Sequence, residues 1–202
     1  MAVNEVAPGI WHWSAFHPNI RKPVHSHWIE PARTALDPLE PPDELPGSPP
    51  ERVVLTCRHH LRSSEGLGAP ILAHEDGLHE FAGGAPDVQG FRFGEEIAPG
   101  IVTHEVASIA PDDTALLIEH GGGALALADS VIRWEDRLCF VPDFLMGDDP
   151  EAVKDGLRAA IERLLELDFQ HLLMAHGEPS VGNGKEELRA FLDAGTPSAA
   201  FS

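Results

Sequence analysis

The sequence predicts a mixed α/β protein in which sheets are flanked by helices. Short apolar, β-branched runs separated by Gly and Pro fill the first two thirds of the 202-residue chain, a pattern typical of strands. Apolar residues at helical spacing appear mainly in the last third, between and after further strand-like runs. With 43% hydrophobic but only 6% aromatic residues, the chain can bury a mostly aliphatic core.

The expected strands follow one another along most of the chain. Residues 24–30 and 34–37 form a predicted pair joined by the turn 31–33. A Pro-dense stretch at about 38–50 excludes a strand interior or a long helix and predicts a surface loop. Residues 83–100 are Gly-rich and only weakly patterned. Further strands are expected at 52–56, 69–75, 101–108, 114–120, 123–130 and 171–177.

Gly, Asp and Pro mark the expected turns and helix starts. The Gly121-Gly122 step between two strands predicts a hairpin. Asp149 is a good N-cap and Pro150 suits the first helical position. A second helix is expected at about 185–194, where a glycine follows. The stripe of the first helix consists of Val153, Leu157, Ala160, Ile161, Leu164 and Leu165.

Composition limits the classes of partner. The formal net charge is 14 − 33 = −19, which disfavours nucleic acid and anionic membrane surfaces because both require Lys and Arg. Two cysteines are too few for a disulfide framework, and no signal peptide or membrane span is recognised. We therefore expect one domain over residues 1–202, in the cytoplasm, without nucleic-acid or membrane partners. The sequence does not indicate an oligomeric state.

Potential metal ligands follow three predicted strands at the point where each ends. Cys57 and His59 follow the first strand, Asp129 follows the second, and His176 follows the third. Thiolate, imidazole and carboxylate are the ligands of Zn²⁺, so the four residues can form one tetrahedral shell. Taken singly, each histidine is more commonly a hydrogen-bonded, partly buried side chain, and the spacing alone leaves both interpretations open.

Together these strand ends resemble the metallo-β-lactamase fold superfamily over about 24–192. The predicted first hairpin ends at Asp37, "LTCRHHLRSS" stands where that superfamily has Thr-His-x-His-x-Asp-His, and "ALALADSVI" and "LLMAHGEP" resemble its later Asp and His motifs. The resemblance implies a four-layer αββα sandwich with metals at one edge. It also implies a relationship to proteins that are mostly hydrolases.

The first motif departs from that pattern. Only His59 falls on a ligand position, while Cys57 replaces a His, Leu61 replaces the Asp and Arg62 replaces the last His. His60 falls on a position that is not a ligand. A further family His is replaced by an apolar residue, Ile109, in the stretch "SIAPDDTALLI".

The resemblance leaves His59, Asp129 and His176 as ligands, with Cys57 as a fourth. We expect these residues to hold at most one Zn²⁺ or similar ion and no dinuclear site, because a bridging hydroxide needs more ligands and charge. Whether an ion binds at all stays open. If it does, four protein ligands would form a closed, structural site with no open position for water.

Three further side chains are expected to line the cavity. Arg62 should point into the former second-metal position and pair with Asp129, directly or through water, or bind an anionic group of a small molecule. His60 and Asp112 are expected beside it.

Two functions follow from these departures. The first is a non-catalytic or strongly diverged member of the fold with a binding or assembly role. The alternative is a mononuclear metal-dependent hydrolase of a small ester, amide or thioester. The residues leave open whether the protein is an enzyme.

Overall fold

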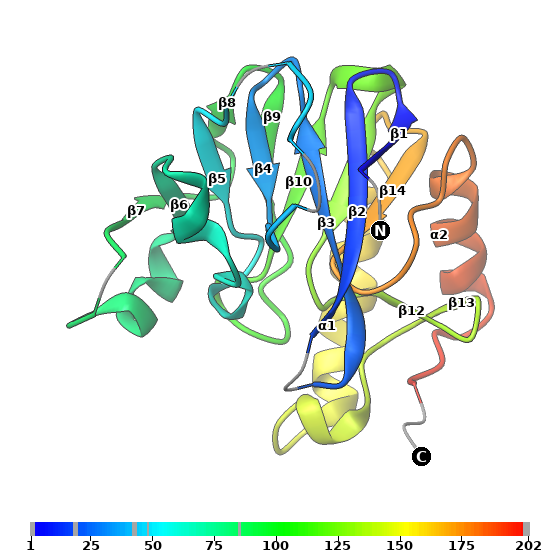
Figure 1. Cartoon of the computed structure of the whole chain (residues 1–202). Coiled ribbons are helices and arrows are strands. Elements are labelled where there is room, and N and C mark those ends of the chain that lie inside the picture. The colour runs from blue at the N-terminus through cyan, green and yellow to red at the C-terminus, as the bar shows by residue number, and fades with distance from the viewer. Residues whose placement is uncertain (1–2, 18–19, 42–43, 48, 85, 200–202) are drawn as a thin grey trace.

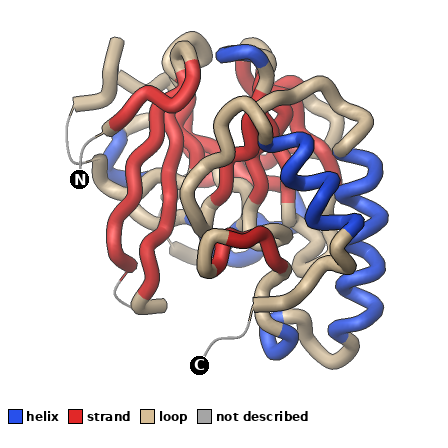
Figure 2. Tube along the Cα trace, turned by 90° about the vertical axis from the view of Figure 1, so that its right-hand side faces the viewer, coloured by secondary structure: helices blue, strands red, loops and turns tan. Residues whose placement is uncertain are grey.

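The computed structural model describes residues 3–17, 20–41, 44–47, 49–84 and 86–199. Two sheets pack face to face, and the two α-helices lie together on one side of the strands (Figures 1 and 2). This arrangement confirms the mixed class that the sequence predicts.

The first sheet has seven strands whose order in space equals their order in the chain. Its first four strands pair antiparallel, and β4 to β7 pair parallel. The strands are β1 (Asn4–Ala7), β2 (Ile10–His17), β3 (Lys22–Ile29), β4 (Thr34–Leu36), β5 (Arg52–Val54), β6 (Ile71–His74) and β7 (Val88–Phe91).

The second sheet has five strands in the order β14-β11-β10-β9-β8, and only the β14/β11 pair is parallel. A separate two-stranded ribbon follows β11 in the chain. The strands of the second sheet are β8 (Glu96–Ala98), β9 (Ile101–Glu105), β10 (Thr114–Ile118), β11 (Ala124–Leu127) and β14 (His171–Met174), and those of the ribbon are β12 (Ile132–Trp134) and β13 (Arg137–Cys139).

Helices α1 (Pro150–Leu164) and α2 (Gly184–Asp193) cover the outer face of the second sheet. The α1 start is as predicted, because the Asp149 carboxylate accepts the Ala152 N–H at 3.1 Å and Pro150 takes the first helical position. The buried stripe packs against β11 and β14. Figure 2 shows both helices on this side of the strands.

The outer face of the first sheet is covered by shorter elements. Trp13 and Trp28 are almost fully buried there, against the Pro-rich loop and 3-10 turns. The Trp28 indole N–H donates to the Pro46 carbonyl at 3.0 Å, which fastens the loop to the sheet. The 3-10 turns of the chain are η1 (Arg58–His60), η2 (Ser64–Leu67), η3 (Glu75–Phe81), η4 (His120–Gly122) and η5 (Asp143–Leu145).

The structure adds strands that sequence patterns did not predict. The N-terminal hairpin partner β2 pairs with β3 over eight residues, although only β3 was expected. Alternating Trp and His residues obscure the pattern, because the first half of β2 is buried or half-buried on both faces. Strands β7 and β8 lie within the weakly patterned 83–100 segment. The predicted hairpin between β10 and β11 is confirmed, with Gly121 and Gly122 at positive φ.

The sandwich brings several strand ends to one edge. The chain leaves β4 at Asp37, β5 at Cys57, β11 at Asp129 and β14 at His176, and these segments approach one another although they are far apart in sequence. The Thr114 N–H donates to the Thr56 carbonyl at 2.9 Å and links the two sheets there. This edge is the candidate site.

Candidate metal centre

The buried Asp37 carboxylate holds the loop after β5 in place at this edge. Its backbone has φ 45°, and its buried carboxylate turns back towards the loop after β5. It accepts the Thr56 N–H at 2.8 Å and the Thr56 hydroxyl at 2.5 Å, and lies 3.0 Å from His60 Nδ1. Burial alone raises the pKa of Asp37, but His60, Arg62 and the Thr56 hydrogen bond outweigh it, so the pKa lies below its usual value.

His60 joins Asp37 to a second carboxylate. Its Nε2 lies 3.4 Å from Asp129 Oδ1, so the buried ring stands between two acids from different sheets. Burial lowers the pKa of His60, but Cys57 and the carboxylates of Asp37 and Asp129 outweigh it and raise the pKa well above its usual value. These neighbours favour the imidazolium form of His60 when no metal ion is bound.

Asp129 has a second histidine partner. Its Oδ1 lies 3.0 Å from His176 Nε2, and both side chains are partly exposed, at 29% and 23%. Burial raises the pKa of Asp129, but His60 and His176 overcome this effect and hold it well below its usual value. Asp129 is therefore ionised and faces both the interior and solvent.

Cys57 completes a group of three possible ligands. One ligand atom each of Cys57, His60 and Asp129 lie within 4.8 Å of one another. Burial raises the pKa of the Cys57 thiol, so it is protonated unless a cation stabilises the thiolate. Thiolate, imidazole and carboxylate form a donor set that suits Zn²⁺.

Asp113 is an isolated acid beside this group. Both carboxylate oxygens are buried and have no hydrogen-bond partner among the described residues. Burial, helped by the charge of Asp129, raises the pKa of Asp113 to about 8. A buried carboxyl without a partner is costly when ionised, and a nearby cation would stabilise its charged form. Cys57, His60 and Asp129 therefore offer the donors for one metal ion, and Asp113 is a buried acid whose pKa responds to the charge of this group.

The two neighbouring histidines His59 and His60 have the opposite roles to those that the motif resemblance implies. His60 lies in the site, whereas His59, the expected ligand, is exposed. The reason is local: residues 58–60 form the 3-10 turn η1, whose geometry rotates His59 outward and His60 inward. Spacing in the motif could not reveal this turn.

Arg62 has partners other than the expected one. Its guanidinium donates to the carbonyls of His25 at 2.7 Å, Asp37 at 2.8 Å and Ala175 at 3.4 Å. No ion pair with Asp129 forms among the described residues, because three carbonyl oxygens engage the guanidinium. Arg62 does contribute positive charge to the site, since it lowers the pKa of Asp37.

Asp112 supports the loop and does not line the site. Its buried carboxylate accepts the Arg58 N–H at 2.6 Å and forms an ion pair with the Arg58 guanidinium. This contact joins the segment before β10 to η1, which carries His60. Asp112 thereby helps to position Asp113 and His60.

The turn that carries His176 is held by Arg133. The Arg133 N–H donates to the His176 carbonyl at 2.8 Å, and its guanidinium binds the Glu178 carbonyl and, from α2, the Glu187 carboxylate. Gly177 has φ 121°, and a Cβ built there would stand 2.3 Å from Arg133 Cβ. Glycine is therefore required after His176.

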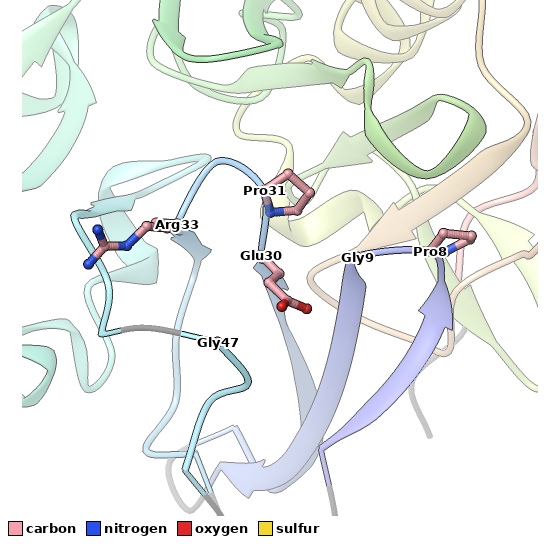
Figure 3. A pocket seen from close by; sticks show the side chains of 6 residues that line it. All are labelled: Pro8, Gly9, Glu30, Pro31, Arg33 and Gly47. Carbon is pink, nitrogen blue, oxygen red and sulfur yellow. The ribbon is translucent and has the colours of Figure 1, made fainter.

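A separate pocket lies at the opposite end of β4, near Arg33 (Figure 3). Its one carboxylate belongs to Glu30, which accepts the Trp11 indole N–H at 2.9 Å. This pocket shares no residue with the candidate metal centre. It is lined by Pro8, Gly9, Glu30, Pro31, Arg33 and Gly47.

Solved structures resemble this chain closely in fold. A metallo-beta-lactamase from Pontibacter korlensis superposes with a TM-score of 0.67 at 17% identity, covering 95% of this chain and 96% of that chain. A metallo-beta-lactamase family protein from Thermus thermophilus gives 0.65 at 15% identity, covering 94% and 80%. A beta-lactamase domain protein from Burkholderia ambifaria gives 0.63 at 19%, covering 95% and 76%.

No protein-family model and no curated protein matches the sequence. The structural likeness shows that the chain has the metallo-β-lactamase fold, as expected, although 3-10 turns and a loop, and not an α-helix, form the outer layer on the first sheet. Within the residues described, no helix is long and apolar enough to cross a membrane.

We predict that Gly177→Ala destabilises the protein more than Gly182→Ala. Both glycines have positive φ, but only Gly177 lacks room for a Cβ. Gly182→Ala should cost about 1 kcal/mol from backbone conformation alone, and Gly177→Ala about 1–3 kcal/mol more from overpacking. Urea unfolding of the two variants measures the difference, and equal losses would contradict the steric argument.

We also predict a pH-dependent contribution from Glu187. Its hydrogen bonds from Arg133 depress its pKa, so its contribution to stability is present above the unfolded pKa of about 4.3 and disappears as pH falls through the lower folded value. Glu187→Gln should lower the unfolding free energy by about 0.5–1 kcal/mol at pH 7, since the pair is partly solvent-screened. The gap to wild type should narrow as pH falls below the unfolded pKa and close only below the lower folded pKa. Glu186→Gln, at an exposed neighbour, should change stability little at either pH.

Proposed function

We propose that this protein is a mononuclear metal-dependent hydrolase of a small ester, amide or thioester, with Zn²⁺ or a similar ion held by Cys57, His60 and Asp129. The convergence of these three donors carries the proposal. Three protein ligands leave a fourth position open, which is the arrangement of catalytic rather than structural zinc sites.

The residues around the three ligands support this use. Asp37 binds His60 Nδ1 and so directs Nε2 towards Asp129. His176 orients the Asp129 carboxylate from the solvent side. When bound, an ion of this kind lowers the pKa of a water ligand and polarises a carbonyl.

Asp113 is the candidate general acid–base group. A pKa of about 8 allows its carboxyl to hold a proton at neutral pH and exchange it without a large free-energy cost. A small uncharged or weakly charged substrate is favoured over nucleic acid, because the chain carries a net charge of −19. We place this activity in the cytoplasm, where Cys57 would stay reduced.

A specific observation favours a second candidate, a binding or assembly protein without catalysis. A protonated His60 neutralises Asp37 and Asp129 without any metal, and Arg62 brings a further positive charge to the same edge. In that case side chains, and not a metal ion, supply the positive charge of the site, and the fold serves as a scaffold for binding.

We predict that Co²⁺ bound at this centre gives thiolate-to-metal charge-transfer absorption that saturates at one equivalent per chain. Cys57→Ser should abolish the absorption, and His60→Ala should weaken binding at least about 100-fold, since even indirect partners of a ligand contribute 10–100-fold. His59→Ala is the matched control and should bind as wild type, because His59 is exposed. A second bound Co²⁺ that also produces thiolate absorption would contradict a mononuclear centre.

We predict that the Zn²⁺-loaded protein hydrolyses chromogenic small esters or thioesters. Chelation should remove the activity, and Asp113→Asn should lower kcat about 10²–10⁴-fold, the usual contribution of a general acid–base group. The metal absorption of the Co²⁺ form should persist in Asp113→Asn. Tight metal binding without hydrolysis of any ester, amide or thioester in such a panel would favour the binding protein.

A further inference from the structure

A second group of potential ligands lies beside the candidate metal centre. It combines His12 of β2, His25 of β3 and Glu178 of the turn after β14, and one ligand atom of each lies within 4.8 Å of the others. His12 Nε2 is 2.8 Å from His25 Nδ1, and His12 Nδ1 is 3.8 Å from Glu178 Oε2. None of these residues belongs to the first centre.

The register of the hairpin explains why histidines gather here. His12 pairs with His27 across the β2/β3 ladder, and His25 stands two residues from His27 on the same face. The ring centroids of His12 and His25 are 5.1 Å apart, and those of His12 and His27 are 5.3 Å apart. Three imidazoles thus occupy one patch between the sheets.

The backbone fixes this patch against the third ligand element. The His25 N–H donates to the Ala175 carbonyl at 2.9 Å, which joins β3 to the start of the turn that carries Glu178. Arg133 holds the Glu178 carbonyl at 3.1 Å from the other side. Ligands on rigid, hydrogen-bonded elements need little reorganisation when an ion binds.

The chemistry of the patch matches a transition-metal ion. All three histidines are buried, and His27 Nε2 has no hydrogen-bond partner among the described residues. A neutral imidazole ring nitrogen is a preferred ligand of Zn²⁺ and similar ions. Glu178, 69% exposed, supplies negative charge from the solvent side.

The observed spacing is close to that of a shared ion. Two nitrogens on a tetrahedral Zn²⁺ with bonds of about 2.0–2.1 Å are separated by about 3.3 Å. The His12 and His25 nitrogens at 2.8 Å need only a small opening of the rings. His12 makes these two contacts with different ring nitrogens, Nε2 towards His25 and Nδ1 towards Glu178 at 3.8 Å, so hydrogen bonding and ion pairing account for each contact singly. The metal site rests on the third observation, that one His12 nitrogen lies within 4.8 Å of ligand atoms of both His25 and Glu178.

We propose that His12, His25 and Glu178 form a second metal site that binds Zn²⁺, Co²⁺ or Ni²⁺. Imidazole-rich sets select these ions over Mg²⁺ and Ca²⁺. Arg62 donates to the His25 carbonyl and the Asp37 carbonyl, and the two groups of ligands share no residue. The two ions would therefore not share a bridging ligand.

Co²⁺ titration of the full chain tests this site, with bound metal measured by equilibrium dialysis and mass spectrometry. We expect one equivalent that produces no thiolate absorption, because the second site contains no Cys. His25→Ala should weaken that equivalent at least about 100-fold, and Glu178→Gln about 10–100-fold. Ser14→Ala, opposite His25 on the same face, is the control and should leave it unchanged.

The outcomes separate the two sites. In Cys57→Ser, the thiolate absorption should disappear while the second equivalent remains, so failure of the first centre would not mask this site. If His25→Ala does not fold, the Co²⁺ affinity of the second site in Glu178→Gln provides the test, because the Glu178 side chain is exposed. The proposal is overturned if wild type binds no equivalent beyond the thiolate centre, or if folded Glu178→Gln binds Co²⁺ with unchanged affinity.

Discussion

The burial of the Asp37 carboxylate is the constraint on which the candidate centre depends. A carboxylate that is removed from water must find hydrogen-bond donors or positive charge, and Asp37 finds both in Thr56 and His60. Those contacts use the His60 Nδ1 and leave Nε2 towards Asp129, which comes from the other sheet. One buried charge thus fixes the loop after β5, the orientation of His60 and the place where the two sheets meet.

The same network shows how side-chain cations can balance the carboxylates at this edge. Divalent ions balance clustered carboxylates, and a protonated imidazole and a guanidinium can perform part of that task. His60 lies between two acids, and Arg62 adds positive charge while binding backbone carbonyls. A metal at Cys57, His60 and Asp129 would replace the proton on His60, so proton and metal compete for one nitrogen.

Two kinds of histidine environment therefore lie at one edge of the sandwich. Neighbouring negative groups raise the pKa of His60, whereas burial and neighbouring positive groups lower the pKa of His25. The backbone that separates them is tied by Arg62, which reaches carbonyls of β3, of Asp37 and of the segment after β14. Local charge, and not the net charge of −19, decides which form each ring takes.

The sequence by itself determined the class of fold, the Asp149 cap of α1 and the hairpin at Gly121. It also determined the strand ends that carry Cys57 and Asp129. All of these features depend on local periodicity and turn chemistry. Only the tertiary structure decided that His60 and not His59 faces inward, since a 3-10 turn sets that direction.

The fold likewise decided three further features, which are the partners of Arg62, the isolation of Asp113 and the approach of His12 to Glu178. Each joins residues more than twenty positions apart in the chain or depends on which groups are absent around a buried atom. Such relations arise from packing one sheet on another, and no local pattern in the chain encodes them.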